Sequence, residues 1–457
     1  MFEAHDPSVF VLPGSPDPTI DPTSYLRSIY AVRERSKLVL EKAKKNDLHH
    51  FNVDLSKFAD TASFVVSIIK RDFSPDYSKI PPHGRWQHFD VGGEARVNTM
   101  LGSWGSNVDT CERTRRLIDL FVVSVLLDAG AGTKWSYKSK ESGKSFRRSE
   151  GLAVASLEMF KAGTFSSNPS QPYQVDSVAL EALTMETMAN GLQVSNANPI
   201  DGLDGRTRLL VQLGHALKNK EIFGADSRPG NMLDYLLSHP GTQAGPDPVI
   251  PLPTLWDTLM DGLVSIWPGT RTKINGVPLG DAWPCTTMPN DPQQPWKNIL
   301  PFHKLTQWLT YSLMVPMQKI ANIRFIGVEL MTGLPEYRNG GLLVDTGLLT
   351  LKSDDHKRGV EQYHMNASRG GQQSVEVVPL FTADDDVIVE WRALTVGFLD
   401  ELLVEVNNLL GLKDDKKLSL AQMLEAGSWK GGREIAEVSR PNTKEPPIMI
   451  LSDGTVF

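Results

Sequence analysis

Two short segments combine residue types that can bind or transform a small polar molecule. The first is Pro335-Glu336-Tyr337-Arg338-Asn339-Gly340-Gly341, where an acid, a phenol and a guanidinium precede two glycines. Glycine lets a backbone approach a ligand closely. The alternative is a solvated turn with a local ion pair, which the spacing alone favours slightly. Glu336, Tyr337 and Arg338 are therefore candidates and not an assigned site.

The second segment is Pro301-Phe302-His303-Lys304, at the predicted start of a helix. Proline is favoured at the first helical position, so we expect His303 and Lys304 in the first turn, where backbone N–H groups favour an anion. Lysine is depleted there because its charge opposes the helix dipole. Lys304 is therefore a candidate for contacting a phosphate or carboxylate, and an ordinary surface lysine is an equally weighted alternative.

Two further groups are weaker candidates. A basic cluster lies on an expected hairpin, where period-two spacing predicts a solvated face, and an anion contact from Arg147 or Arg148 is the alternative. Its members are Lys138, Lys140, Lys144, Arg147 and Arg148. One loop contains His83, His88 and Asp90, which are metal-ligand types, but such loose spacing usually marks ordinary hydrogen-bonding residues.

Composition and missing motifs narrow the function. The chain has 457 residues, a net charge of -7 and 40% hydrophobic residues, which is typical of a globular protein and not of one that binds nucleic acid through its phosphates. The most apolar stretch, 117–127, contains Asp119 and is shorter than the ~20 residues of a membrane helix. Two cysteines and the absence of a signal-peptide pattern predict a reducing, cytoplasmic location. No P-loop, dinucleotide-binding, zinc-protease or serine-hydrolase signature is present.

Hydrophobic periodicity predicts a mainly α fold with minor β structure. We expect Asp109 to cap a helix, and Ser149 to cap the next one. The clearest helix is 384–410, which Gly411 ends. The other predicted elements are helices at 24–45, 177–189, 203–219 and after Pro301, a hairpin at 134–148, irregular segments at 81–93 and 240–300, a strand or loop at 342–352, and a strand and turn at 447–457.

These elements predict one large α+β domain. Residues 1–108 are expected to form an N-terminal arm with helices and a Gly-rich loop, 109–411 a helical core, and 412–457 a C-terminal appendage. All three parts are expected to pack together. The sequence does not indicate an oligomeric state.

Several segments closely resemble the uracil catabolism protein 4 family, long described as a domain of unknown function, number 1688. The resemblance spans nearly the whole chain. It implies a uracil-degrading route in which uracil becomes its ribosyl phosphate, the ring is opened, and a ribosylurea-type intermediate precedes the release of urea. The segments that carry it are Phe89-Asp90-Val91-Gly92-Gly93-Glu94-Ala95-Arg96, Leu101-Gly102-Ser103-Trp104, Leu127-Asp128-Ala129-Gly130-Ala131-Gly132, Phe146-Arg147-Arg148-Ser149-Glu150-Gly151-Leu152 and Glu336-Tyr337-Arg338-Asn339-Gly340-Gly341.

Residues 117–410 more distantly resemble the queuosine-phosphate N-glycosylase family, which implies a core similar to helical DNA glycosylases with a small β-hairpin region. The matching segments are the hairpin and helix at 134–163, Phe302-His303-Lys304, Val389-Glu390-Trp391-Arg392-Ala393 and Glu336-Tyr337-Arg338. That family has an aspartate before Tyr-Arg, whereas this chain has the longer Glu336. Gly340 and Gly341 also depart from its pattern, so we expect a different pocket.

Together the resemblances imply an N-glycosidase that hydrolyses a ribosylurea phosphate to urea and ribose phosphate. The reaction passes through an oxocarbenium-like state, which a carboxylate near the anomeric carbon stabilises while it orients or deprotonates water. No metal or organic cofactor is needed. The expected catalytic residues are Glu336 and Tyr337, and the expected substrate- or phosphate-binding residues are Lys304, Arg338, His303, Asp281, Arg96 and His88.

Two other function classes are alternatives. A cysteine-dependent amidohydrolase would attack a ureido carbonyl with Cys285, in Trp283-Pro284-Cys285-Thr286, and would need a base nearby in space. A non-catalytic scaffold of the same pathway would turn over no intermediate and would co-purify with a pathway enzyme.

Overall fold

The computed structural model describes residues 12–132, 134–368 and 375–451. It is mainly α with minor β structure, which confirms the predicted helical and strand content. In its N-terminal half the α-helices are α1 (Pro22–Arg27), α2 (Ile29–Ala43), α3 (Phe58–Phe73), α4 (Arg85–Phe89), α5 (Arg96–Ser103), α6 (Thr110–Leu126), α7 (Arg148–Lys161), α8 (Ser177–Glu181), α9 (Met185–Gly191) and α10 (Leu203–Ala216). They continue as α11 (Lys220–Phe223), α12 (Met232–Ser238), α13 (Leu252–Gly262), α14 (Lys304–Ala321), α15 (Tyr337–Asp345), α16 (Ser353–Ser368), α17 (Asp386–Leu410), α18 (Leu420–Met423) and α19 (Trp429–Ser439).

The strands of the described residues form six separate two-stranded pairs. These are β1 (Phe51–Val53) with β10 (Leu349–Leu351), β2 (Tyr137–Lys138) with β3 (Ser145–Phe146), β4 (Val249–Pro251) with β9 (Arg324–Ile326), β5 (Lys273–Ile274) with β6 (Val277–Pro278), β7 (Ala282–Pro284) with β8 (Ile299–Pro301), and β11 (Leu380–Thr382) with β12 (Met449–Leu451). The β4–β9 and β11–β12 pairs are parallel. Because each pair is so short, the strands only connect neighbouring loops through hydrogen bonds. They do not form a layer of the core.

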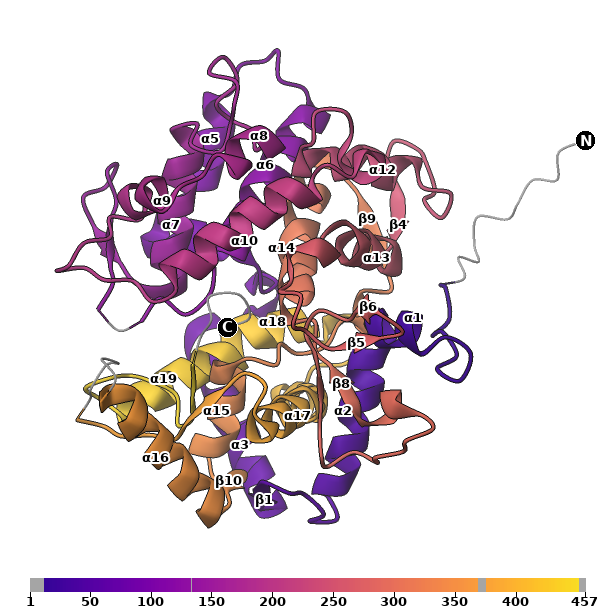
Figure 1. The fold of residues 1–457 in the computed structure, drawn as a ribbon, viewed down its shortest axis with the longest axis vertical. Helices are drawn as coiled ribbons and strands as arrows, with labels where there is room; N and C mark the ends of the chain where they lie inside the picture. The colour runs from indigo at the N-terminus through magenta and orange to yellow at the C-terminus, as the bar shows by residue number, and fades with distance from the viewer. Residues whose placement is uncertain (1–11, 133, 369–374, 452–457) are drawn as a thin grey trace, which may run out of the picture.

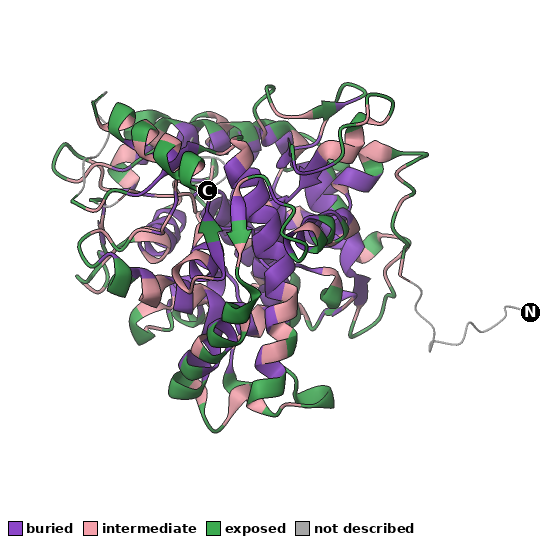
Figure 2. Cartoon of the chain, turned by 90° about the horizontal axis from the view of Figure 1, so that it is seen from below, coloured by how far each residue is buried: buried purple, intermediate pink, exposed green. Residues whose placement is uncertain are grey.

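Packing between distant helices builds the core. Helix α14 packs against α6, and α17 packs against α2 and α3, so the first helices of the chain contact the last long one. In Figure 1, α5–α13 occupy the upper part of the molecule, and α2, α3 and α15–α19 occupy the lower part. Figure 2 shows buried residues concentrated along the inner helices, with exposed residues on the outer ones.

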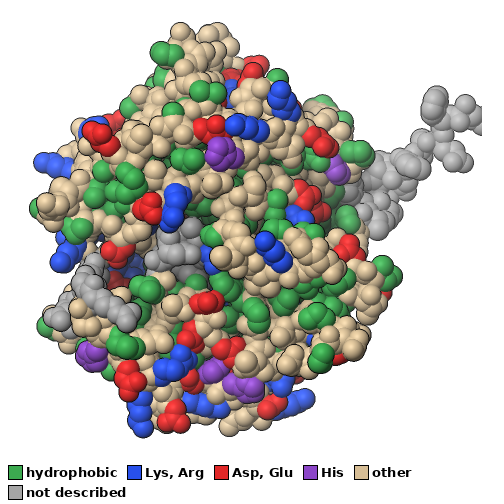
Figure 3. Space-filling model, in the orientation of Figure 1, with side chains coloured by type: hydrophobic (Ala, Val, Ile, Leu, Met, Phe, Trp, Pro, Cys, Tyr) green, Lys and Arg blue, Asp and Glu red, His purple; other side chains and the backbone are tan. Residues whose placement is uncertain are grey.

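The face drawn in Figure 3 carries charges of both signs. On the face shown in Figure 3, Lys and Arg side chains are interspersed with Asp and Glu and do not gather into one patch. Among the described residues, no helix has the length and apolar character that a membrane crossing requires.

Several predicted elements are confirmed. The side chain of Asp109 caps α6 by accepting a hydrogen bond from the Glu112 N–H. The predicted hairpin is the β2–β3 pair. Helix α17 covers nearly all of the predicted 384–410 helix, and Gly411, with a φ of 71°, ends it. Helix α10 occupies most of 203–219.

Four predicted helix boundaries were wrong, because local backbone conformation and capping residues place the helix ends elsewhere. Ser149 does not cap α7, since that helix already begins at Arg148. Pro301 is not the first residue of a helix, because it ends β8, and His303, with a φ of 44°, precedes α14. The single helices predicted at 24–45 and 177–189 are each divided in two, where Ser28 and Thr184 cap new helices.

The irregular segments also contain more structure than their sequences indicated. Segment 81–93 contains α4, 240–300 contains α13 and strands β4 to β8, and 342–352 is divided between the end of α15 and β10. The terminal strand is β12, and residues 452–457 lie outside the described part of the chain, as do residues 1–11 of the expected arm.

His50, which follows α2, contacts carboxylates of two helices from the C-terminal part of the chain. His50 Nδ1 lies 2.9 Å from the Asp355 carboxylate of α16, and its Nε2 lies 2.8 Å from the Asp386 carboxylate of α17. Burial alone would lower the pKa of His50, but the hydrogen bonds to Asp386 and Asp355 outweigh it and raise this pKa to about 9.

We therefore expect the free energy of unfolding to decrease as pH rises from about 6.5 to about 9. The raised pKa means that the stabilisation is fully present below the unfolded-state pKa and is lost as His50 deprotonates in the folded protein. The loss is on the order of 3 kcal/mol. Urea denaturation at several pH values should show this slope, and His50→Gln should remove it. An unchanged slope in His50→Gln would contradict the assignment.

Candidate active site

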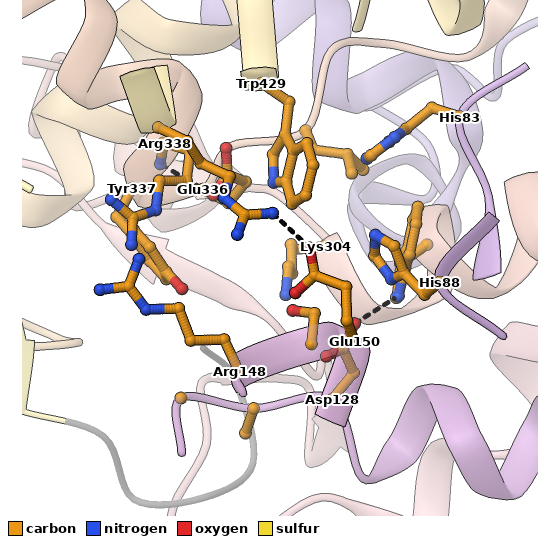
Figure 4. A pocket seen from close by; sticks show the side chains of 16 residues that line it. His83, His88, Asp128, Arg148, Glu150, Lys304, Glu336, Tyr337, Arg338 and Trp429 are labelled. Carbon is orange, nitrogen blue, oxygen red and sulfur yellow. Dashed lines mark hydrogen bonds and ion pairs between the residues drawn. The ribbon is translucent and has the colours of Figure 1, made fainter. Parts of the chain in front are cut away.

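Three helices begin around one pocket: α7 at Arg148, α14 at Lys304 and α15 at Tyr337. Each helix N-terminus carries a partial positive charge. The Asp281 carboxylate accepts an N–H at the start of α14 and the Glu336 carboxylate accepts two at the start of α15, whereas α7 has no side-chain cap. The pocket, drawn in Figure 4, is lined by His83, His88, Asp128, Ala129, Gly130, Arg148, Ser149, Glu150, Lys304, Trp308, Leu334, Glu336, Tyr337, Arg338, Trp429 and Arg433.

Glu336 lies in the pocket wall and caps α15. Its two carboxylate oxygens accept hydrogen bonds from the backbone N–H groups of Arg338, at 2.8 Å, and Asn339, at 2.6 Å. Glutamate is not among the residues usually preferred as caps. Burial raises the pKa of Glu336 above its ordinary value, although these N–H groups and the nearby Lys304 act in the opposite direction. The carboxylate is therefore held rigidly by its own helix, and each oxygen keeps a second lone pair for a ligand.

Lys304 is the first residue of α14 and also lines the pocket. The pKa of its ammonium group is lowered, because the effect of burial outweighs the opposite effect of the Asp128 and Glu336 carboxylates. Figure 4 shows Lys304 in the middle of the pocket, between Glu336 and Asp128. An ammonium between two carboxylates is well placed to fix their orientation and to contact a polar substrate atom.

A buried ion pair behind the pocket sets the positions of both Lys304 and Glu336. Asp281 makes two hydrogen bonds with the Arg392 guanidinium, at 2.8 and 2.7 Å, and both side chains are almost completely buried. The same carboxylate accepts the backbone N–H of Lys304 at 2.9 Å. Arg392 Nε in turn donates to the carbonyl of Pro335, directly before Glu336, at 3.1 Å. One ion pair therefore joins the starts of α14 and α15.

Three arginines, Arg148, Arg338 and Arg433, line the pocket. Arg148 and Arg338 both donate to the carbonyl of Lys444, at 3.3 and 3.0 Å. Burial lowers the pKa of Arg148, and the nearby Arg338 lowers it further. Arg433 forms an ion pair with Glu150. A neutral carbonyl holds Arg338, whereas Arg148 also lies 3.8 Å from the Glu445 carboxylate, so part of the charge of Arg148 is already paired.

The glycines beside the site serve packing. A methyl group on Gly340 would lie 2.7 Å from Thr395 Oγ1 and 2.8 Å from the Trp391 ring, so this position faces α17 and not a ligand. Gly341 faces Pro447. Gly432 lets α19 approach the Arg338 carbonyl so closely that any side chain there would overlap it. The proposal that Gly340 and Gly341 open the backbone to a ligand is therefore wrong.

Asp128 and Glu150 also line the pocket, and sequence reasoning did not single them out. Asp128 follows α6 and forms an ion pair with the fully buried Arg85 at 2.8 Å. Burial would raise the pKa of Glu150, but the charge and the hydrogen bond of Arg433 contribute to lowering it overall. Both residues lie in segments that carried the family resemblance. No spacing signal marks them, because Arg85 and Arg433 reach them from distant parts of the chain.

The structure brings together five of the eight residues proposed from the sequence: Glu336, Tyr337, Lys304, Arg338 and His88. The other three do not line this pocket. Asp281 and His303 are buried, and His303 Nε2 is hydrogen-bonded to the Leu26 carbonyl. Arg96 binds the carbonyls of Phe89 and Val91 and the Glu94 carboxylate.

The possible metal ligands do not converge. The Asp90 carboxylate accepts from Trp86 Nε1 and the Val97 N–H, whereas His83 is paired with Glu425 and His88 faces Arg85. In the described residues, no group of three or more His, Cys, Asp or Glu side chains is arranged to hold a metal ion.

Comparison with known proteins defines the family. The family model described as "Protein of unknown function (DUF1688)" matches residues 25–457. The chain belongs to this family. It is 48% identical to "Uracil catabolism protein 4" of Lachancea kluyveri over 448 residues, which cover 96% of this chain and 100% of the relative. It is 44% identical to "Protein urg3" of Schizosaccharomyces pombe, over 94% of this chain and 98% of that protein.

We expect Asp281→Asn to lower the free energy of unfolding by about 3–5 kcal/mol, because Arg392 would keep a buried charge without a counter-ion. The matched control is Arg71→Gln, which breaks ion pairs of a half-exposed arginine with Asp72 and Glu434. That change should lower the free energy of unfolding by about 1 kcal/mol or less. Denaturant titrations measure both values, and equal losses in the two variants would show that the buried pair has no special structural role.

Proposed function

We propose that this chain acts in uracil catabolism by hydrolysing the N-glycosidic bond of a ribosylurea phosphate. The relatives' names support the pathway. The observation that carries the reaction is a rigidly held carboxylate, Glu336, in one pocket with Lys304 and the arginines Arg148, Arg338 and Arg433. Water would supply the oxygen that bonds to C1 of the ribose, the C1–N bond would break, and a proton would reach the departing nitrogen. The products would be ribose 5-phosphate and neutral urea.

The charge distribution of the pocket matches such a substrate. Arg148 and Arg338 can bind the phosphate oxygens, since guanidinium groups match phosphate geometry. Figure 4 shows Tyr337 beside these arginines and Lys304 between Glu336 and Asp128. A sugar bound between them would place its anomeric carbon near Glu336. The carboxylate would then stabilise the positive charge that develops on the ring and orient the attacking water.

The position of Cys285 argues against the amidohydrolase alternative. Its side chain is buried in a hydrophobic cluster with Trp283 and Met288 and does not line the pocket. Burial, together with the Asp386 charge, raises the pKa of the thiol to about 12. A nucleophilic cysteine needs the opposite shift, because the thiolate is the reactive form.

Incubation of the purified protein with ribosylurea 5′-phosphate, followed by mass spectrometry, tests the proposal directly. We expect equal release of urea and ribose 5-phosphate. Glu336→Gln should lower kcat by roughly 10²–10⁴-fold, because the variant carries no charge. Glutamine keeps one carbonyl for the helix cap, but its NH2 group faces the second backbone N–H, so the melting temperature should fall modestly while the protein stays folded.

The control for this assay is Cys285→Ala, which should keep the wild-type rate. Release of ammonia or carbon dioxide that depends on Cys285 would instead identify an amidohydrolase. Absence of turnover, together with stable co-purification of another pathway enzyme, would identify a scaffold. Either result would overturn the glycosidase proposal.

The pH dependence provides a separate test. Glu336 must be ionised to act, and its pKa is raised above the ordinary value of 4.5. We therefore expect kcat/KM to fall as pH decreases, with the midpoint of this acidic limb above pH 4.5. A rate profile from pH 4 to 8 measures it. An acidic limb centred at or below pH 4.5 would show that Glu336 is not the ionising group.

A further inference from the structure

One end of the pocket contains two buried polar atoms without hydrogen-bond partners. They are Oδ1 of Asp128 and Nε2 of His88, and both residues line the pocket. The Asp128 side chain is 7% exposed and His88 is 5% exposed. Buried polar atoms are nearly always paired, so two unpaired atoms in the wall of one cavity indicate that a ligand completes them.

Arg85 determines which of these atoms donates a hydrogen bond. Its Nη1 lies 3.2 Å from His88 Nδ1 and 2.8 Å from the other Asp128 oxygen, Oδ2. A guanidinium can only donate, so Nδ1 of His88 must accept. Burial and the neighbouring Arg85 lower the pKa of His88 to about 4, so the ring is neutral at pH 7. Its single proton is therefore on Nε2, which makes Nε2–H a donor without a partner. Asp128 Oδ1 is an acceptor without a hydrogen-bond partner, although the nearby Ser149 hydroxyl helps to lower the pKa of this carboxyl.

Both residues are held rigidly around this pair of atoms. Trp308 Nε1 donates to Asp128 Oδ2 at 3.1 Å, and the Trp308 ring lies 5.6 Å from the His88 ring. Arg206 binds the carbonyls of Leu127, Ala129 and Gly130 on either side of Asp128. The donor and the acceptor therefore do not have to be reoriented when a ligand binds.

Flat rings surround this end of the pocket. The ring centroids of His83 and Trp308 are 4.6 Å apart, and those of His88 and Trp429 are 5.5 Å apart. Aromatic walls are suited to a planar group. Figure 4 shows His83 and His88 on one side of the pocket and Arg148 and Tyr337 on the other, with Lys304 between them.

We infer that Asp128 and His88 form a ureido subsite, in which His88 Nε2–H donates to the ureido carbonyl and Asp128 Oδ1 accepts from a ureido N–H. This inference rests on the proposed function and adds the orientation of the substrate. The phosphate lies at Arg148 and Arg338, the sugar near Glu336 and Lys304, and the planar leaving group at the aromatic end. Urea presents a carbonyl and N–H groups in one plane, which a ribose diol does not.

Binding measurements in the Glu336→Gln background test the subsite without turnover. Isothermal titration calorimetry would compare ribosylurea 5′-phosphate with ribose 5-phosphate, which lacks the ureido group. We expect the ribosylurea ligand to bind more tightly. Adding His88→Phe should weaken it by about tenfold, because its carbonyl loses a donor, and should change the affinity for ribose 5-phosphate by less than about twofold.

Two matched variants control for general damage to the pocket. His88→Gln should recover much of the lost affinity, because its amide can accept from Arg85 and donate to the ligand. Arg148→Gln should weaken both ligands by a similar factor, since both carry the phosphate. Melting temperatures would show that each variant is folded.

The outcomes separate this inference from the proposed function. Equal weakening of both ligands by His88→Phe would overturn the ureido subsite, even if the wild-type protein hydrolyses ribosylurea 5′-phosphate. Selective weakening of the ribosylurea ligand would support the subsite, even if no hydrolysis occurs. Failure of the wild-type protein to bind ribosylurea 5′-phosphate would overturn both.

Discussion

The Asp281–Arg392 ion pair connects the parts of the chain that build the site. The β7–β8 pair places Ala282 opposite Pro301, which brings Asp281 beside the start of α14. The backbone carbonyl of Asp281 accepts the N–H groups of Phe302 and His303, and its carboxylate accepts that of Lys304. Arg392, from the middle of α17, then holds the segment before Glu336. A buried pair is costly to desolvate, and here it fixes two pocket residues, at the starts of α14 and α15, through an arginine of α17.

The proposed anionic substrate is compatible with a chain that is acidic as a whole, because a pocket can differ in charge from the rest of the protein. The net charge is -7, but Arg148, Arg338 and Arg433 bring positive charge into the pocket beside the carboxylates of Glu336, Asp128 and Glu150. The proposed ligand, with a phosphate at one end and a neutral hydrogen-bonding group at the other, could contact both kinds of group.

The sequence indicated some of the residues that line the candidate pocket and missed others. Glu336, Arg338 and Lys304 were found because acids, cations and glycines cluster next to predicted helix ends. Arg433 and Trp429 were missed, because only the close packing of Gly432 against Arg338 brings α19 to the pocket. Asp281 was predicted to contact the ligand, but its partner Arg392 lies 111 residues away, and a pair of that separation leaves no local pattern. Hydrophobic periodicity alone predicted single helices at 24–45 and 177–189. In the structure, Ser28 and Thr184 each cap a second helix within these segments.

The crystal structure of Glu336→Gln with ribosylurea 5′-phosphate is the most direct test of this account, because it shows the orientation of the ligand. We expect the phosphate at Arg148 and Arg338, the anomeric carbon beside residue 336, and the ureido group between Asp128 and His88. A ligand bound outside this pocket, or one with its anomeric carbon away from residue 336, would contradict the account.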